Sequence, residues 1–117
     1  MNAVNSNLYA RGLQLFNLSE FYEAHEVLED VWRAEAGPHK LFLQALIQVA
    51  VALHHHSTGN IVGAKSLLKR ATRNLSSYPE SYFNLNLTQF RNSLIEWQIA
   101  LEENRSAPPF PKLETLP

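Results

Sequence analysis

The most apolar stretch of the chain, LFLQALIQVAVAL, covers residues 41–53 and is interrupted only by Gln44 and Gln48. A helix that crosses a bilayer needs about 20 consecutive apolar residues, so this stretch is too short to span a membrane. It shows no strand-like alternation of polar and apolar residues. We therefore interpret it as the central, buried helix of a soluble protein, and we expect no membrane partner.

Turn and capping signals divide the rest of the chain into further helices. Gly37-Pro38 and Gly59 are typical stop signals for a helix. Ser19 and Asn60 are of residue types that commonly cap a helix N-terminus, so we expect a helix to begin at each of them. The pattern predicts five helices, which cover residues 5–16, 19–36, 39–57, 60–78 and 87–104. No segment alternates as a strand does, so the sequence predicts an all-α protein.

The five predicted helices and the residues after them form two parts. Residues 1–104 are expected to form a single helical domain, and residues 105–117 a proline-rich C-terminal tail that cannot be helical. The tail either docks over the bundle through Phe110 or serves as a ligand for another domain. We favour docking, because a single PPFP segment is weak evidence for a recognition motif.

A weak internal repeat indicates how the helices pack. When the sequence is shifted by forty residues, Ala10 falls on Ala50 and Ala24 falls on Ala64, and the large apolar residues around them also coincide. Small residues at close helix crossings are typical of stacked helical hairpins. We therefore predict a compact five-helix bundle of antiparallel hairpins with tetratricopeptide-like packing.

Composition narrows the classes of function. The net charge is −1, which gives no overall attraction to nucleic acid, and the absence of cysteine excludes disulfides, thiolate catalysis and cysteine zinc sites. The N-terminus lacks a basic start followed by an apolar run, so no signal peptide is predicted. These features are typical of a cytoplasmic protein.

Charge is unevenly distributed between two of the predicted helices. Residues 19–36 carry six acidic residues and one basic residue, Arg33. All charged residues of 60–78 are basic, and they include Lys65, Lys69 and Arg73. We interpret the basic stripe as a solvated face partly paired with the acidic helix. No aromatic residues interleave with its charges, so no nucleic-acid partner is expected.

The second predicted helix carries the first half of a candidate site. His25 and Glu29 lie one turn apart at the border of its apolar face, beside Trp32. Glu26 is adjacent to His25 in sequence but faces away from it. An imidazole next to a carboxylate is a combination that serves acid–base chemistry or ligand binding.

The third predicted helix carries the second half. Gln44, Gln48 and His55 fall within an arc of about 40° on this apolar helix. A buried amide without a partner costs roughly 1–3 kcal/mol, so these groups need polar neighbours. Because a short Gly37-Pro38 link joins the two helices, we predict that both polar lines face each other across a polar cleft, with Trp32 closing one end.

Three functions remain open for this cleft. It could bind a small polar molecule or a peptide, with Tyr22 and Trp32 as apolar walls and the glutamine and histidine side chains as orienting contacts. It could be an enzyme site in which His25 is a general base held by Glu29, or in which His25, Glu29 and His55 bind a divalent metal. It could also be a structural hydrogen-bond network in the core of an interaction scaffold.

The spacing of these residues is not that of a known metal signature. His-x-x-x-Glu is neither the His-Glu-x-x-His zinc motif nor the Glu-x-x-His motif of di-iron bundles, so we predict no metal site, and the cofactor stays unknown. Exposed apolar residues on the last predicted helix are compatible with a homodimer.

Three segments together resemble a known family. FYEAHEVLEDVW, FLQALIQVAVALHHHSTGN and GAKSLLKRA are similar to the bacterial and archaeal family called domain of unknown function 309, over about residues 8–80. The motif positions are His25, Glu26, Glu29, Trp32, Gln44 and Gln48. The resemblance implies an all-helical fold of packed hairpins and a functional His-Glu-Trp cluster, but it implies no reaction.

Overall fold

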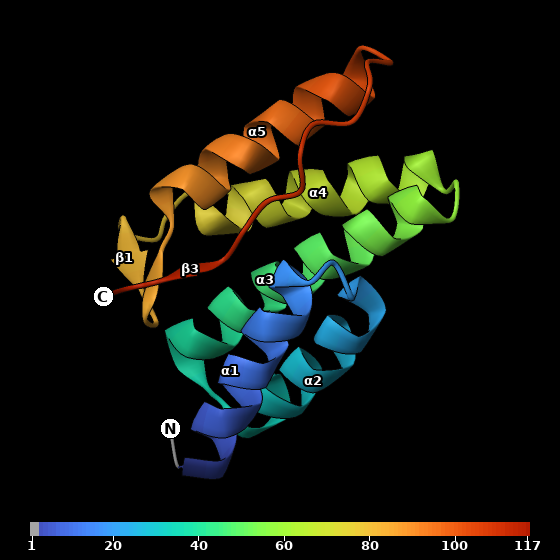
Figure 1. Cartoon of the computed structure of the whole chain (residues 1–117). Coiled ribbons are helices and arrows are strands. Elements are labelled where there is room, and N and C mark those ends of the chain that lie inside the picture. Colours follow the sequence, from blue (N-terminus) through green and yellow to red (C-terminus); the bar gives the residue numbers. More distant parts are fainter. Residues whose placement is uncertain (1–2) are drawn as a thin grey trace.

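Five helices make up most of the protein. The computed structural model describes residues 3–117, so residues 1–2 of the predicted 1–104 domain lie outside the described residues. The helices pack in a compact globule, as predicted (Figure 1), and they are α1 (Ala3–Asn17), α2 (Phe21–Ala34), α3 (Gly37–Ser57), α4 (Ile61–Leu75) and α5 (Thr88–Glu102). The all-α bundle is therefore confirmed, whereas its likeness to tetratricopeptide packing stays a prediction.

Helix α3 lies at the centre of the fold. It packs against α2 on one side and against α4 on another, and eight of its apolar residues, from Phe42 to Leu53, are buried. The prediction of a buried central helix is confirmed. No helix in the described part of the chain is long and apolar enough to cross a membrane.

The central position of α3 keeps α2 and α4 apart. Each helix packs mainly on its neighbours in sequence, so the predicted pairing of acidic α2 with basic α4 is wrong. The ion pairs of Arg33 are made instead within α2, to Asp30 at 2.6 Å and to Glu29 at 3.4 Å.

Helix ends follow the predicted turn chemistry only in part. Gly37-Pro38, predicted as the stop between the second and third helices, forms the first turn of α3, and α2 ends earlier, at Ala34. Asn60 caps α4, because its side-chain oxygen accepts the Gly63 N–H at 2.9 Å. Ser19 is not the predicted N-cap of α2; it has a φ of +65° and belongs to the end of α1. Its N–H donates to the Phe16 carbonyl and the Glu20 N–H to the Leu15 carbonyl, which is a Schellman ending.

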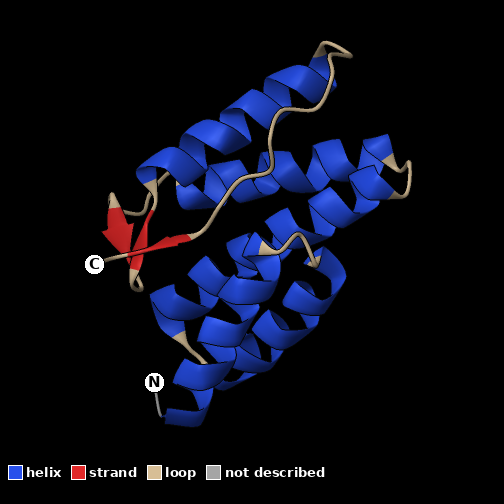
Figure 2. Ribbon diagram, viewed as in Figure 1, coloured by secondary structure: helices blue, strands red, loops and turns tan. Residues whose placement is uncertain are grey.

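A small antiparallel sheet, which was not predicted from the sequence, joins the hairpin before α5 to the tail after α5. Its strands β1 (Ser81–Tyr82), β2 (Leu85–Asn86) and β3 (Glu114–Thr115) lie in the order β1-β2-β3 at one end of the bundle (Figure 2). Two-residue strands are too short to leave an alternating pattern. Residues Phe83 and Asn84, both with positive φ, form the hairpin turn.

The tail after α5 docks on the bundle. It runs back across the helices to reach β2 (Figure 1). The ring of Phe110 stacks on the buried ring of Trp97, whose Nε1–H donates to the Pro109 carbonyl at 3.0 Å. Leu113 is 2% exposed. The predicted docking through Phe110 is therefore confirmed.

Candidate functional site

His25 and Glu29 are in contact, as their spacing on α2 predicts. His25 Nε2 lies 3.3 Å from Glu29 Oε1, and His25 Nδ1–H donates to the Tyr22 main-chain carbonyl at 2.8 Å. The Tyr22 carbonyl can only accept, so Nδ1 carries the hydrogen of this hydrogen bond. The two contacts together hold the His25 ring between Tyr22 and Glu29 on α2.

His25 also lines a small cleft between α2 and α3. The cleft has a volume of about 170 Å³, and its lining residues are Phe21, Tyr22 and His25 from α2 and Val51, His54 and His55 from α3. We call it the histidine cleft. The structure thus brings together three of the predicted site residues, Tyr22, His25 and His55, and adds His54, which was not among the predicted site residues.

Ring contacts order the side chains of the histidine cleft. The ring of Tyr22 lies 5.2 Å from that of His25 and 5.3 Å from that of His54, so it bridges the two helices. The His55 Nδ1 lies 3.4 Å from the side-chain nitrogen of Asn60, just beyond the end of α3. Except for Val51, the residues that line the cleft carry aromatic or imidazole rings.

Gln44 and Gln48 do not join the histidine cleft. Gln48 Oε1 accepts a hydrogen bond from Asn74 Nδ2 on α4 at 3.1 Å, and Gln44 lines a separate cavity with Arg73 and Ser77. The prediction that both glutamines face His25 is therefore wrong. A helical wheel gives the angle between side chains but not which of two neighbouring helices a given face meets, and here the part of the face that carries Gln44 and Gln48 meets α4.

Trp32 lies two turns along α2 from His25, toward the turn that leads into α3. It is partly buried against the core, and Lys40 Nζ lies 4.1 Å from the centre of its ring. Its Nε1–H is buried and has no hydrogen-bond partner among the described residues. Trp32 is not among the residues that line the histidine cleft, so it does not close the cleft as predicted.

The structure gives no geometric support to the metal alternative. Within residues 3–117, no group of three or more histidine, aspartate or glutamate side chains is arranged to hold a metal ion. His25, Glu29 and His55 therefore do not form such a group.

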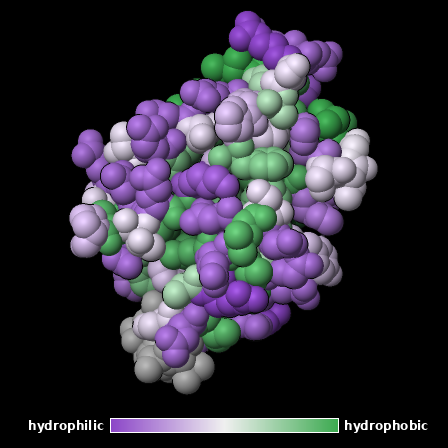
Figure 3. Space-filling view, viewed as in Figure 1, coloured by the Kyte–Doolittle hydropathy of each residue, from purple (hydrophilic) through white to green (hydrophobic). Residues whose placement is uncertain are grey.

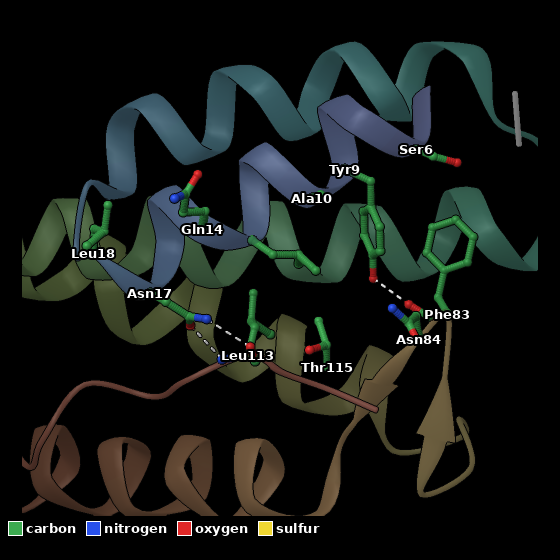
Figure 4. Close-up of a pocket in the computed structure, with 11 residues that line it drawn as sticks. Ser6, Tyr9, Ala10, Gln14, Asn17, Leu18, Phe83, Asn84, Leu113 and Thr115 are labelled. Carbon is green, nitrogen blue, oxygen red and sulfur yellow. Dashed lines mark hydrogen bonds between the residues drawn. The ribbon is translucent and has the colours of Figure 1, made fainter. Parts of the chain in front are cut away.

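A larger cavity, which sequence reasoning missed, lies on another face of the molecule. It has a volume of about 610 Å³ and runs between α1, the β1–β2 turn and β3 (Figure 4). We call it the α1–β3 groove, and its lining residues are Ser6, Tyr9, Ala10, Leu13, Gln14, Asn17, Leu18, Phe83, Asn84, Leu113 and Thr115. On this face, hydrophobic residues reach the surface among hydrophilic ones (Figure 3).

One sequence signal for the groove exists. Ser6, Ala10 and Gln14 repeat at four-residue spacing on α1, and all three are exposed, whereas Ala50, the repeat partner of Ala10, is buried. Small and polar side chains along one helix face leave space beside the helix. The opposite wall comes from residues 83–84 and 113–115, which no local pattern connects to α1.

The fold and the histidine cleft define a small helical-bundle domain with an aromatic and imidazole-lined cavity between its second and third helices. The chain belongs to the family described as Domain of unknown function (DUF309), whose model matches residues 9–67. All lining residues of the histidine cleft fall in the matched segment, whereas the α1–β3 groove takes part of its lining from outside it.

Two curated relatives are similar to this chain. An uncharacterised protein of Aquifex aeolicus (strain VF5) is 33% identical over 82 residues, which are 69% of this chain and 25% of the relative. The uncharacterised protein YpuF of Bacillus subtilis (strain 168) is 34% identical over 73 residues, which are 62% of this chain and 42% of that protein. The chain thus spans less than half of the length of either relative.

Proposed function

We propose that the protein is a ligand-binding module, and that its histidine cleft binds a planar molecule of about one aromatic ring that carries an oxygen acceptor such as a carboxylate. The observation that carries the proposal is the convergence of three imidazoles with the rings of Phe21 and Tyr22 around one cavity. Convergent polar groups in a mainly apolar cavity are the usual features of a small-molecule site.

The size of the cleft supports a ring-sized ligand. Its volume is about 170 Å³. An apolar cavity of roughly 150 Å³ is large enough to hold benzene, and drug-sized ligands need about 300 Å³ or more. Phe21 and Val51 supply apolar contact, and the half-exposed ring of Tyr22 offers a surface for stacking.

Two imidazoles of the cleft supply donors to an oxygen acceptor. The His54 ring forms no hydrogen bond within the described part of the chain, and the only one of His55 is the 3.4 Å contact with Asn60. Their remaining N–H groups can therefore donate to a ligand carboxylate. Glu29 already pairs with His25, so the ligand meets no unpaired acid from that residue.

The alternatives receive less support from the geometry. A general base needs a free ring nitrogen, but both nitrogens of His25 contact acceptors. A structural network in the core needs buried polar side chains, and no polar or charged residue in the described part of the chain is buried. The binding alternative requires neither condition.

Titration of isotope-labelled protein with benzoate, followed by NMR, tests the proposal. Benzoate should shift the ring signals of Tyr22 and His54, and His54→Ala and His55→Ala should each weaken binding by about tenfold, which corresponds to about 1.4 kcal/mol. Gln44→Ala is the matched control and should bind as wild type does, because Gln44 faces α4. Equal binding by all variants would refute the assignment of the site.

A further inference from the structure

We propose that the α1–β3 groove is a second binding site, which takes an uncharged, extended peptide segment as an additional strand on the free edge of β3. This inference is independent of the proposed function, because the groove shares no lining residue with the histidine cleft. Addition of an extended peptide to an exposed sheet edge is a common mode of peptide recognition.

The register of the sheet points the backbone of Thr115 into the groove. Strand β3 pairs only with β2, with Leu85 opposite Thr115 and Asn86 opposite Glu114, and the Leu116 N–H donates to the Asn84 carbonyl at 3.0 Å. In an antiparallel ladder, hydrogen-bonded and non-hydrogen-bonded pairs alternate. The Leu85–Thr115 pair is therefore the non-hydrogen-bonded one, so the Thr115 N–H and carbonyl face away from β2.

Asn17 already occupies the neighbouring position on the same edge. The Leu113 N–H donates to Asn17 Oδ1 at 2.7 Å, and Asn17 Nδ2–H donates to the Leu113 carbonyl at 2.9 Å (Figure 4). The side-chain amide thus makes the pair of bonds that an adjacent strand would make. Residues two apart on a strand direct their backbone groups to the same side, so Thr115 offers the next such pair to a ligand.

The lining of the groove defines the chemistry of the peptide. None of its lining residues is charged, so a charged segment would lose its hydration without gaining an ionic partner, and a neutral segment is favoured. The buried side chains of Leu13 and Leu113 receive an apolar side chain, and Gln14 and Asn84 offer amide groups at the rim. The volume of about 610 Å³ lies in the range of ordinary ligand sites.

The test is an NMR titration of the full chain with the blocked, uncharged peptide acetyl-Thr-Val-Thr-Val-Thr-amide. Binding should shift the Thr115 amide and the Asn17 side-chain amide, and N-methylation of alternate peptide residues should abolish the shifts because it removes backbone donors. The variant Thr115→Pro loses the N–H that faces the groove and should lose binding. Proline is tolerated on a sheet edge where its nitrogen faces away from the ladder.

A pair of variants on α1 tests whether the peptide occupies the groove itself. Ala10→Trp places an indole in the groove and should block the peptide, whereas Asn7→Trp, an exposed site on α1 outside the lining, should not. Equal binding of the N-methylated peptide, or unchanged binding by Ala10→Trp, would overturn the proposal. So would a dimer by sedimentation that Thr115→Pro dissociates, because the occupant would then be a second copy of the chain.

Discussion

The ring of Phe110 lies almost parallel to that of Trp97, with 5.7 Å between the ring centroids and 8° between the planes. Phe21 at the start of α2 packs edge-on against Phe110, with 5.0 Å between the ring centroids. Residues from α2, α5 and the tail are thus joined in one aromatic cluster. The tail is therefore part of the folded structure, although its prolines exclude a helix there.

Replacement of Phe110 by alanine tests whether the tail contributes to stability. The ring is 40% exposed, so its loss should cost less than that of a fully buried phenylalanine, and we expect a fall of about 1–2 kcal/mol in the free energy of unfolding. Urea denaturation measures this change. Leu116→Ala, a similarly exposed residue with no aromatic contact, is the control. An unchanged midpoint for Phe110→Ala would mean that the tail is only loosely attached.

Asn17 should be more sensitive than other polar residues of α1. Asn17→Leu removes both hydrogen bonds to the Leu113 backbone and should cost about 1–3 kcal/mol, because two partly buried backbone groups lose their partners. Asn17→Asp keeps only the acceptor for the Leu113 N–H, so its stability should lie between those of the wild type and Asn17→Leu. The exposed Asn7→Leu provides the reference. Thermal melts that rank all three variants together would contradict this account.

Local signals predicted the helices well because each boundary depends on neighbouring residues. Gly59 and Asn60 illustrate this, since the left-handed φ of the first ends α3 and the side chain of the second caps α4. The pairing of Leu85 with Thr115 has no such signal, because it joins two-residue strands far apart in sequence. The misassigned Ser19 shows the same limit, since the serine could serve either helix end.

The candidate site was predictable only where one helix fixed it. The contact between His25 and Glu29 follows from their one-turn spacing, and the structure contains it. The direction of Gln48 depends on which helix covers that face of α3, and periodicity does not encode this. Each polar face of a central helix can meet either of its two neighbours, and the glutamines meet α4 and not α2 as predicted.

The pair of His25 and Glu29 should contribute little to stability. Their side chains are 19% and 37% exposed, and a solvent-accessible pair at this spacing contributes about 0.3–0.5 kcal/mol. Urea denaturation of Glu29→Gln should therefore give nearly the midpoint of the wild type, even at low salt. A loss several times larger would favour the structural-network alternative over a binding role for the cleft.

Tyr9 should make the protein sensitive to alkaline pH. Its side chain is 5% exposed and its hydroxyl donates to the Phe83 carbonyl at 2.8 Å, and burial raises the pKa of Tyr9 far above its usual value of about 10. The folded state therefore holds a proton that the unfolded state releases. The contribution of protonated Tyr9 to the free energy of unfolding is fully present below pH ~10 and is lost as the pH rises further.

Tyr9→Phe isolates this effect from the other tyrosines. Below pH ~10 the variant should be less stable by about 1 kcal/mol, because the hydrogen bond to Phe83 is lost. Above that pH the wild type should lose up to about 1.4 kcal/mol more per pH unit than the variant, since one additional proton is released on unfolding. Burial also raises the pKa of Tyr78 and Tyr82, so the variant keeps a smaller alkaline dependence. Urea denaturation at a series of pH values measures both curves, and parallel curves would show that Tyr9 ionises as easily in the folded chain as in the unfolded one.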